Sequence, residues 1–254
     1  MSLETVVIPC LQDNYGYILR DSATGKVAIV DAPEAQPLAA ALDSRGWKLD
    51  LILLTHHHDD HIQGVPPLVA RYGAKVVGAA ADRHRLPKLD IEVKEGDEVA
   101  LGESVARVLD VSGHTAGHIA YSFPGHVFTA DSLMALGCGR LFEGTALQMW
   151  GSLSKLMALP AATLVYSGHN YGVSNGRFAL SIEPGNAALK ARIAEIEAKN
   201  AKGEPICPVT LEEELATNPF LRAKRPEVKA AIGLDGADDA AVFAEIRKRK
   251  DNFQ

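Results

Sequence analysis

The sequence is poor in cysteine and has no long apolar run. Its three cysteines, Cys10, Cys138 and Cys207, lie far apart and form no Cys-x-x-Cys pair. We therefore expect reduced thiols rather than a disulfide framework. No run is long enough to cross a bilayer, and the first residues lack the basic and then apolar pattern of a secretory signal. The expected location is the cytoplasm, with no membrane partner.

An excess of positive charge is also missing. The net charge is -6, which argues against general nucleic-acid binding. The hydrophobic fraction of 47% and the charged fraction of 23% are ordinary for a globular protein, so a sizeable core is expected. One basic stretch stands out at Arg247–Lys250. Taken alone, it is typical of a solvated helix end whose cations favour the helix dipole.

Apolar periodicity and turn residues predict a strand-rich first part and a helical end. We predict strands at Thr5–Pro9, Tyr15–Leu19, Val27–Asp31, Leu51–Leu54, Lys75–Gly78, Glu98–Leu101, Ser104–Asp110, Ile119–Phe123, Val127–Thr129 and, as the last strand, Leu164–Ser167. We predict helices at Pro37–Ser44, Val65–Arg71, Ala187–Asn200, Leu211–Ala216 and Ala240–Arg249, with N-caps at Thr210 and at Asp238 or Asp239. The fold class is α/β, with a catalytic domain over residues 1–173 and a smaller helical domain over residues 174–254.

The most informative stretch, Thr55–His61, reads T-H-H-H-D-D-H and directly follows the apolar run Leu51–Leu54. It holds four of the nine histidines. Imidazole and carboxylate are ligands of borderline divalent metals, and packing so many of them at a sheet edge has a desolvation cost without structural benefit. If the segment is extended, alternate side chains share a side. We then expect one metal at His56 and His58 and another at Asp60 and His61, with His57 and Asp59 pointing away.

Three further candidates follow apolar segments in the same way. They are His114 in S-G-H-T, Asp131 in F-T-A-D and His169 in Y-S-G-H. A lone histidine near a strand end is more often a structural or exposed residue, so each candidate gains weight only beside the first cluster. His84 and His126 lack the pattern and are expected at the surface, and His118 is either a supporting partner or structural.

These motifs, in this order, resemble the metallo-β-lactamase superfamily, and within it glyoxalase II, the hydroxyacylglutathione hydrolases. The resemblance extends to the segments Phe128–Thr145, Gly168–Tyr171, Asn218–Arg222 and Arg247–Phe253. It implies an αββα sandwich with a helical C-terminal domain. It also implies two metal ions, with zinc the default and iron or manganese as alternatives. The implied ligands are His56, His58 and His114 for one ion and Asp60, His61 and His169 for the other, with Asp131 bridging.

The resemblance also implies a glutathione site. The family's contact positions correspond here to Arg140, Phe142, Tyr171, Arg247 and Lys250. Cationic side chains can pair with the two carboxylates of glutathione, which would explain a basic tail on an acidic protein. Four positions depart from the common family pattern, and none of them is a ligand. Phe142 stands in place of tyrosine and Arg140 in place of lysine, while Asn170 stands in place of glutamate and Gln63 in place of glycine.

The implied reaction is hydrolysis of S-D-lactoylglutathione, and of related S-2-hydroxyacylglutathiones, to D-lactate and glutathione. This is the second step of methylglyoxal detoxification. Two metals can bring the pKa of a shared water from ~15.7 toward ~7, and Asp60 and Asp131 would hold the bridging hydroxide that attacks the thioester. A thiol with a pKa near ~8.5 leaves without a dedicated acid. We expect a monomer whose only partner is the glutathione thioester.

Other functions remain open from the residues alone. One is a mononuclear-iron persulfide dioxygenase of the same superfamily, which uses fewer ligands than are present here. Another is a lactone or β-lactam hydrolase, which the glutathione-type tail disfavours. A related nuclease lacks support from the charge, and a non-catalytic binding module would be expected to have lost ligands.

Overall fold

A computed structural model describes residues 3–253 of the chain. The chain divides into two compact units. The first contains the residues up to 110 together with 116–130, and the second contains 111–115 together with 131 to the C-terminal end. The expected domain boundary at residue 173 stays a prediction.

The first unit contains a six-stranded mixed sheet in the order β1-β2-β3-β4-β5-β6. The strands β1 to β3 pair antiparallel, and β3 to β6 pair parallel. Their central members are apolar and buried along nearly their whole length, as is usual for strands covered on both faces. The bounds are β1 (Leu3–Cys10), β2 (Asn14–Asp21), β3 (Val27–Val30), β4 (Leu51–Leu53), β5 (Lys75–Ala79) and β6 (Ile91–Val93).

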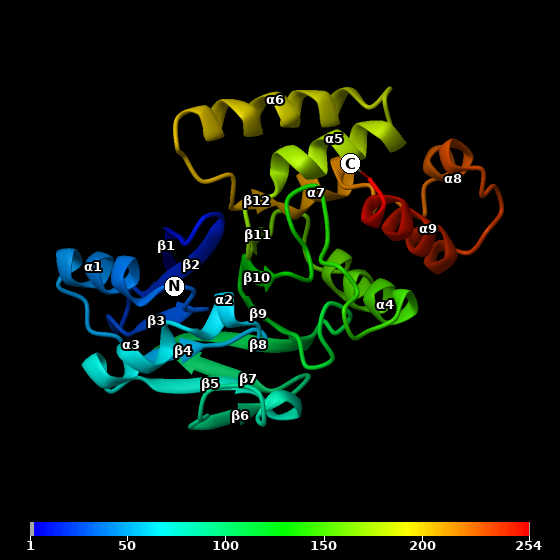
Figure 1. Ribbon diagram of the computed structural model, residues 1–254. Helices are drawn as coiled ribbons and strands as arrows, with labels where there is room; N and C mark the ends of the chain where they lie inside the picture. The colour runs from blue at the N-terminus through cyan, green and yellow to red at the C-terminus, as the bar shows by residue number, and fades with distance from the viewer. Residues whose placement is uncertain (1–2, 254) are drawn as a thin grey trace. The chain divides into compact units, whose positions relative to one another are not determined.

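Parallel strands need crossover connections, and helices supply them here. The helix α1 (Ala35–Arg45) connects β3 to β4, and α2 (Asp59–Ile62) and α3 (Val65–Tyr72) connect β4 to β5. Figure 1 shows α1 and α3 side by side next to the sheet. Their apolar faces join the core that includes Leu38, Leu42, Ile52 and Leu68. Both helices end at glycines with φ of 64° and 67°, the left-handed conformation that favours glycine at this position.

A second set of strands in the first unit pairs antiparallel in chain order. It consists of β7 (Glu98–Leu101), β8 (Ser104–Asp110), β9 (Ile119–Phe123) and β10 (His126–Ala130). The hydroxyl of Tyr121 in β9 donates to the carbonyl of Leu54, 3.0 Å away, at the end of β4. This buried bond ties the two sets of strands together directly below the histidine-rich segment.

A buried carboxylate makes a second tie between the two sets of strands. Asp21, at the end of β2, accepts hydrogen bonds from the hydroxyl of Thr24 at 2.6 Å and from that of Ser104 at 2.7 Å. The turn between β7 and β8 approaches so closely that a Cβ on Gly102 would lie 2.0 Å from the Thr24 hydroxyl. Hydrogen bonds from Thr24 and Ser104 hold the pKa of Asp21 at about 2, against an ordinary value of 3.8.

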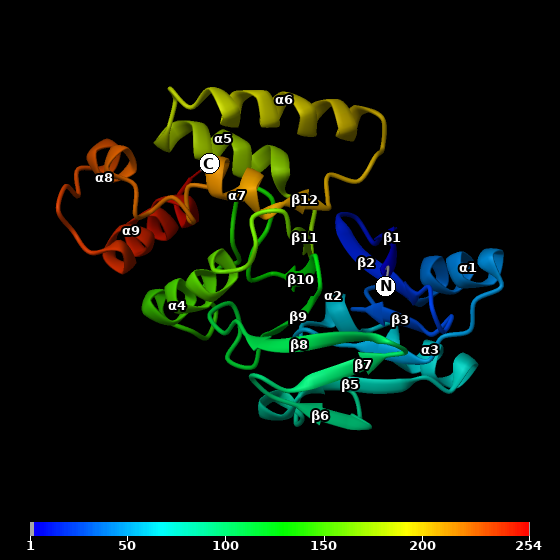
Figure 2. The same ribbon diagram turned by 180° about the vertical axis from the view of Figure 1, so that it is seen from behind.

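The second unit is mainly helical. Its elements are α4 (Ala146–Met157), β11 (Leu164–Ser167), α5 (Gly172–Ile182), α6 (Ala187–Ala201), β12 (Val209–Thr210), α7 (Leu211–Thr217), α8 (Pro226–Ile232) and α9 (Asp239–Asp251). Figure 2 shows α5 beside α6 and α9 against α4. The buried rings of Phe178, Phe220 and Phe243 pack in series, with centroids about 6 Å apart. Capping boxes start α4 at Thr145 and α7 at Thr210.

The predicted elements are confirmed in position, including the N-caps Thr210 and Asp238. Elements that the sequence did not predict are β6, α2, the 3-10 helix Ala80–Asp82, α4, α5, α8 and β12. Because β12 follows β11, the expectation that Leu164–Ser167 is the last strand is wrong. In α5 the glycines Gly172 and Gly176 lower helix propensity, and packing overrides it. A Cβ on Gly176 would lie 2.8 Å from Ile193 of α6, so the glycine permits this close approach.

The Asp21 tie makes folding depend on pH in a defined direction. Because the folded-state pKa is depressed, the carboxylate contributes stability above pH ~4, and this contribution is lost as the pH falls through ~2. We expect Asp21→Asn to lower the melting temperature near pH 7. The difference in melting temperature between the variant and wild type should decrease steadily as thermal melts are repeated at lower pH, down to pH ~2. A gap of constant size over this range would contradict the assigned role.

Candidate metal centre

In the first unit, the two histidines that follow β4 converge on one point. His56 Nε2 lies 3.2 Å from His58 Nδ1. His56 is fully buried and stacks on His118, with ring centroids 4.5 Å apart and planes 14° from parallel. Two nitrogens at this separation can both reach one ion with bonds of about 2.0–2.1 Å. The structure therefore brings these two histidines together, with His118 stacked on His56, and the metal that they are expected to share stays a prediction.

The rest of the segment is not extended. Backbone torsions of His58 are still extended, but Asp59–Ile62 form the helical turn α2. The alternation expected for Asp60 and His61 is therefore wrong, because side-chain directions in a helix repeat about every 3.6 residues. The turn nevertheless brings the two donors together, with His61 Nε2 3.9 Å from Asp60 Oδ2. Asp59 is exposed, as expected.

A carboxylate that the sequence reasoning missed organises this cluster. Asp31, directly after β3, accepts hydrogen bonds from His61 Nδ1 at 2.8 Å and from the Thr55 hydroxyl at 2.8 Å. It also accepts the Thr55 backbone N–H at 2.9 Å. The sequence does carry a signal for Asp31, because it is an acidic residue at the end of an apolar strand, as Asp131 is. Asp31 has a φ of 53°, a conformation that Asp and Asn tolerate better than most residues.

These bonds fix which histidine nitrogen faces a metal. His61 Nδ1 donates its proton to Asp31, so Nε2 carries the lone pair. The Thr55 hydroxyl donates to Asp31 and lies 3.0 Å from His56 Nδ1, from which it accepts, so His56 Nε2 also carries the lone pair. A carboxylate behind a metal-ligating histidine orients the ring and raises its basicity. The cluster therefore has the protonation pattern of a metal site.

The intervening histidine is not the idle spacer that was expected. His57 Nδ1 lies 3.1 Å from Oδ2 of the buried Asp82, whose other oxygen accepts the Arg85 Nε–H at 2.9 Å. A Cβ on Gly117 would lie 2.4 Å from Asp82 Cγ, so the glycine makes room for this carboxylate. The ring of His57 still meets that of His58 edge-on, with centroids 5.0 Å apart, so the expectation that His57 points away from its neighbours is not met. Through Asp82, His57 anchors the segment to the turn that follows β5.

The second unit holds its own cluster of His114, Asp131 and His169. Asp131 Oδ2 lies 3.4 Å from His114 Nε2 and 3.4 Å from His169 Nε2. All three side chains are buried. His114 Nδ1 lies 2.9 Å from the carbonyl of Arg140, to which it donates, so Nε2 carries the lone pair here as well. One carboxylate oxygen equidistant from two imidazole nitrogens is placed as a bridging ligand would be.

Aromatic rings flank this second cluster. The ring of Tyr171 stacks on His169 at 4.7 Å, with planes 7° from parallel. The ring of Phe142 meets His114 edge-on at 5.3 Å and is 63% exposed. The structure thus brings two of the predicted substrate contacts next to two of the predicted metal ligands.

The three cations of the predicted glutathione site differ in their exposure and in their partners. Arg140 is exposed. Arg247 is buried, donates to the carbonyl of Cys138 at 2.9 Å and pairs with Asp251 at 2.7 Å. Lys250 lies over the rings of Phe178 and Phe253. Burial lowers the pKa of Lys250, and the charges of Arg247 and Arg140 lower it further.

Comparison with known proteins matches this architecture to two family models. Residues 11–169 match the metallo-beta-lactamase superfamily, and residues 170–253 match the hydroxyacylglutathione hydrolase C-terminus. Curated hydroxyacylglutathione hydrolases from Ruegeria pomeroyi and Fuscovulum blasticum are 60% and 59% identical over 255 residues, covering 100% of this chain and of each relative. The chain belongs to the hydroxyacylglutathione hydrolase family.

Membership in the hydroxyacylglutathione hydrolase family confirms the predicted fold class. The chain has the αββα fold of the metallo-β-lactamase superfamily with a helical C-terminal region, and it is a hydrolase. A solved structure, ETHE1 from Myxococcus xanthus, has a TM-score of 0.67 and 27% identity, covering 98% of this chain and 90% of that one. Within the described residues, no helix is long and apolar enough to span a membrane.

The donor set of this family member fits divalent metal ions. Histidine and aspartate groups cluster with donor atoms within 4.8 Å of one another, and hydrogen bonds from outer residues set the histidine tautomers. No serine or cysteine nucleophile is needed beside such a site. Cys138 is buried, and burial raises the pKa of its thiol to about 11, so thiolate is scarce at neutral pH.

The outer carboxylate gives a direct test of the first cluster. Asp31→Asn keeps the shape and tolerates the positive φ, but it removes the charge behind His61 and Thr55. We expect metal affinity to fall ~10–100-fold, measured by competition with a chromophoric chelator. Asp43→Asn, which removes a surface partner of Arg71, is the control and should leave affinity unchanged. Equal affinities in the two variants would show that Asp31 has no such role.

Proposed function

We propose that the chain hydrolyses S-D-lactoylglutathione, and related S-2-hydroxyacylglutathiones, to the hydroxy acid and glutathione at a binuclear metal centre. The observation that carries the proposal is the clustering of histidine and aspartate donors, with the tautomers of His56, His61 and His114 fixed by outer hydrogen bonds, in a chain that matches hydroxyacylglutathione hydrolases over its whole length. The same comparison favours this thioesterase over a persulfide dioxygenase or a lactone or β-lactam hydrolase. The wider role would be the second step of methylglyoxal detoxification.

The two ligand clusters would act together. We assign one ion to His56, His58 and His114 and the other to Asp60, His61 and His169, with Asp131 shared. The short separations inside each cluster support this assignment, namely 3.2 Å between His56 and His58 nitrogens and 3.4 Å from Asp131 to each of its histidines. Zinc is the proposed metal, although His and Asp donors also accept iron or manganese.

The bound ions would supply a water of lowered pKa and polarise the thioester carbonyl. The protein's own part is to hold the donors in place. Asp31 and the Arg140 carbonyl keep imidazole protons on the outer nitrogens. With the ions bound, Asp60 and Asp131 would orient the attacking water. The thiol of glutathione leaves as thiolate, since its pKa near ~8.5 makes a dedicated proton donor unnecessary.

Glutathione would bind over the second unit. Its carboxylates would pair with Arg140 and Lys250, and the rings of Phe142 and Tyr171 would pack on its apolar parts. The lowered pKa of Lys250 supports this, because an anion would offset the burial of its ammonium, which is the main cause, and the repulsion from Arg247 and Arg140. Direct contact with Arg247 stays a prediction, since its guanidinium already serves Cys138 and Asp251. We also propose that the chain is a monomer and that it is cytoplasmic, where cysteines without a disulfide framework are usual.

The proposal is tested by thioester hydrolysis with metal-analysed protein. We expect wild type to hydrolyse S-D-lactoylglutathione and His58→Ala to lose at least ~100-fold in kcat, because losing a direct ligand should cost no less than losing an outer partner. His84→Ala changes an exposed histidine outside both clusters and is the matched control. A fully metallated wild type without thioesterase activity would refute the proposal.

Substrate recognition is tested by charge removal on one helix. Lys250→Gln should raise KM about tenfold and leave kcat nearly unchanged, since a charge-assisted hydrogen bond contributes about 1.5–3 kcal/mol. Lys248→Gln removes an exposed cation from the same helix and should leave KM as in wild type. Steady-state kinetics at low ionic strength, where exposed charges are least screened, gives the comparison. Equal KM values for both variants would exclude Lys250 from the site.

A further inference from the structure

The loop between Asp131 and Arg140 connects the proposed bridging ligand to a proposed substrate contact. Its residues up to position 139 are buried. The loop turns on Leu136, whose φ is 59°, and is closed by paired hydrogen bonds between Met134 and Gly137 of 3.0 and 2.9 Å. Buried backbone groups that remain outside these bonds need other partners, because leaving them unpaired is costly.

Asn218, which caps the C-terminal end of α7, adds a second hydrogen bond to each of the two carbonyls that close the turn. Its side-chain amide lies 3.3 Å from the Met134 carbonyl and 3.0 Å from the Gly137 carbonyl, and donates to both. Its own oxygen accepts the Phe220 backbone N–H at 3.0 Å, which fixes the orientation of the amide. Asn218 is fully buried. A single side chain therefore holds both ends of the turn.

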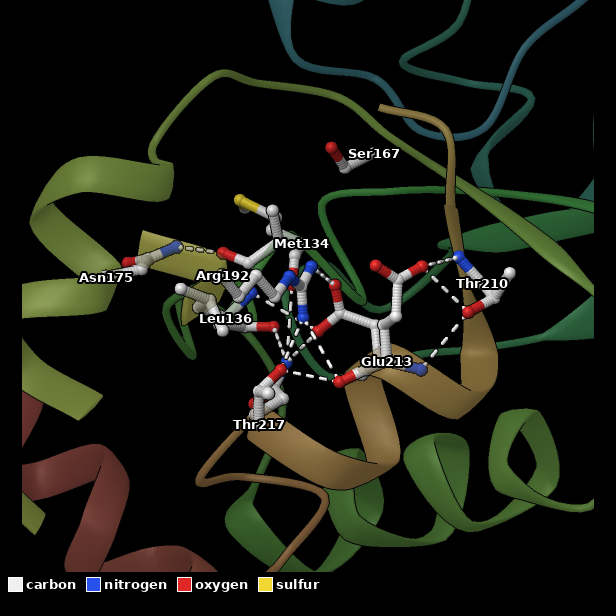
Figure 3. A network of polar contacts seen from close by, with 12 residues as sticks. Met134, Leu136, Ser167, Asn175, Arg192, Thr210, Glu213 and Thr217 are labelled. Carbon is white, nitrogen blue, oxygen red and sulfur yellow. Dashed lines mark hydrogen bonds and ion pairs between the residues drawn. The ribbon is translucent and has the colours of Figure 1, made fainter. Parts of the chain in front are cut away.

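Two further side chains hold its tip. Asn175 of α5 donates to the Ala135 carbonyl at 3.0 Å. Glu214 of α7 accepts the Leu136 backbone N–H at 3.2 Å. The contact with Asn175 is so close that a Cβ on Gly137 would lie 2.4 Å from its amide nitrogen. Figure 3 shows these bonds meeting around Leu136.

The carboxylate in this group is stabilised from behind. Glu214 is fully buried and pairs with the guanidinium of Arg192 from α6. The same guanidinium donates to the Thr217 hydroxyl at 2.6 Å. A buried carboxylate is tolerated when it is paired and hydrogen-bonded in this way. Glu214 thus presents one oxygen to Arg192 and the other to Leu136 and Asn218.

We propose that Asn175, Glu214 and Asn218, here called the loop clamp, are positioning residues that fix Asp131 and Arg140 for catalysis. The loop belongs to the segment matched by the superfamily model, whereas all three clamp residues belong to the C-terminal family segment. The C-terminal helices then serve the metal cluster as well as the substrate. The expected effect on kcat and KM rests on the proposed function, whereas the expected effects on the loop and on metal affinity do not.

The test compares Asn218→Ala and the milder Asn175→Ala, which removes one bond to the loop, with Asn186→Ala. Asn186 caps α6 and donates to the Ala216 carbonyl, so its loss destabilises the same unit without touching the loop. We expect faster amide hydrogen exchange at Leu136 and roughly tenfold or greater loss of metal affinity in the clamp variants only. With substrate, both a lower kcat and a higher KM are expected, since the loop carries a metal ligand and a substrate contact.

The outcomes separate the two proposals. If the wild type does not hydrolyse the thioester, the proposed function fails, while exchange at Leu136 and metal affinity still decide on the clamp. If Asn218→Ala does not fold, Asn175→Ala carries the test. Clamp variants that match Asn186→Ala in Leu136 exchange and in metal affinity, at equal loss of melting temperature, would overturn the clamp.

Discussion

The metal chemistry of this protein depends on imidazole rings held in one tautomer by groups behind them. Asp31 accepts hydrogen bonds from His61 Nδ1 and from the Thr55 hydroxyl, and that hydroxyl in turn accepts from His56 Nδ1. In the second unit the Arg140 carbonyl does the same for His114. Burial without these partners would leave polar atoms unsatisfied, and with the wrong tautomer the nitrogen facing the ion would carry a proton. The strand ends hold the backbone of these residues in place, and the outer hydrogen bonds determine which imidazole nitrogen can bind a metal.

Much of this could be predicted from the sequence, for identifiable physical reasons. Long apolar strands and well-capped helices carry strong local signals, and the segment Thr55–His61 has little use apart from metal binding. The helical turn α2 was not visible, because four residues are too few for periodicity to separate it from an extended strand end. Asp31 was missed because a single acidic residue after a strand is common, and only its contacts reveal its role.

The C-terminal helices illustrate what sequence reasoning leaves out. The segment Asn218–Arg222 could be recognised as a family signature, but a signature does not say what its residues touch. The structure shows Asn218 holding two loop carbonyls and Glu214 holding an amide. Arg247, predicted only as a substrate contact, holds the Cys138 carbonyl a few residues farther along the same loop. Such contacts between residues far apart in the chain depend on packing, which no local pattern encodes.

One experiment tests both the binding of two metal ions and their role in thioester hydrolysis. Metal-free protein is titrated with zinc while S-D-lactoylglutathione hydrolysis and bound metal are followed together. The account predicts that activity rises with zinc until two ions are bound per chain and then stays constant. Binding that ends at one ion per chain, or two bound ions without hydrolysis, would contradict it.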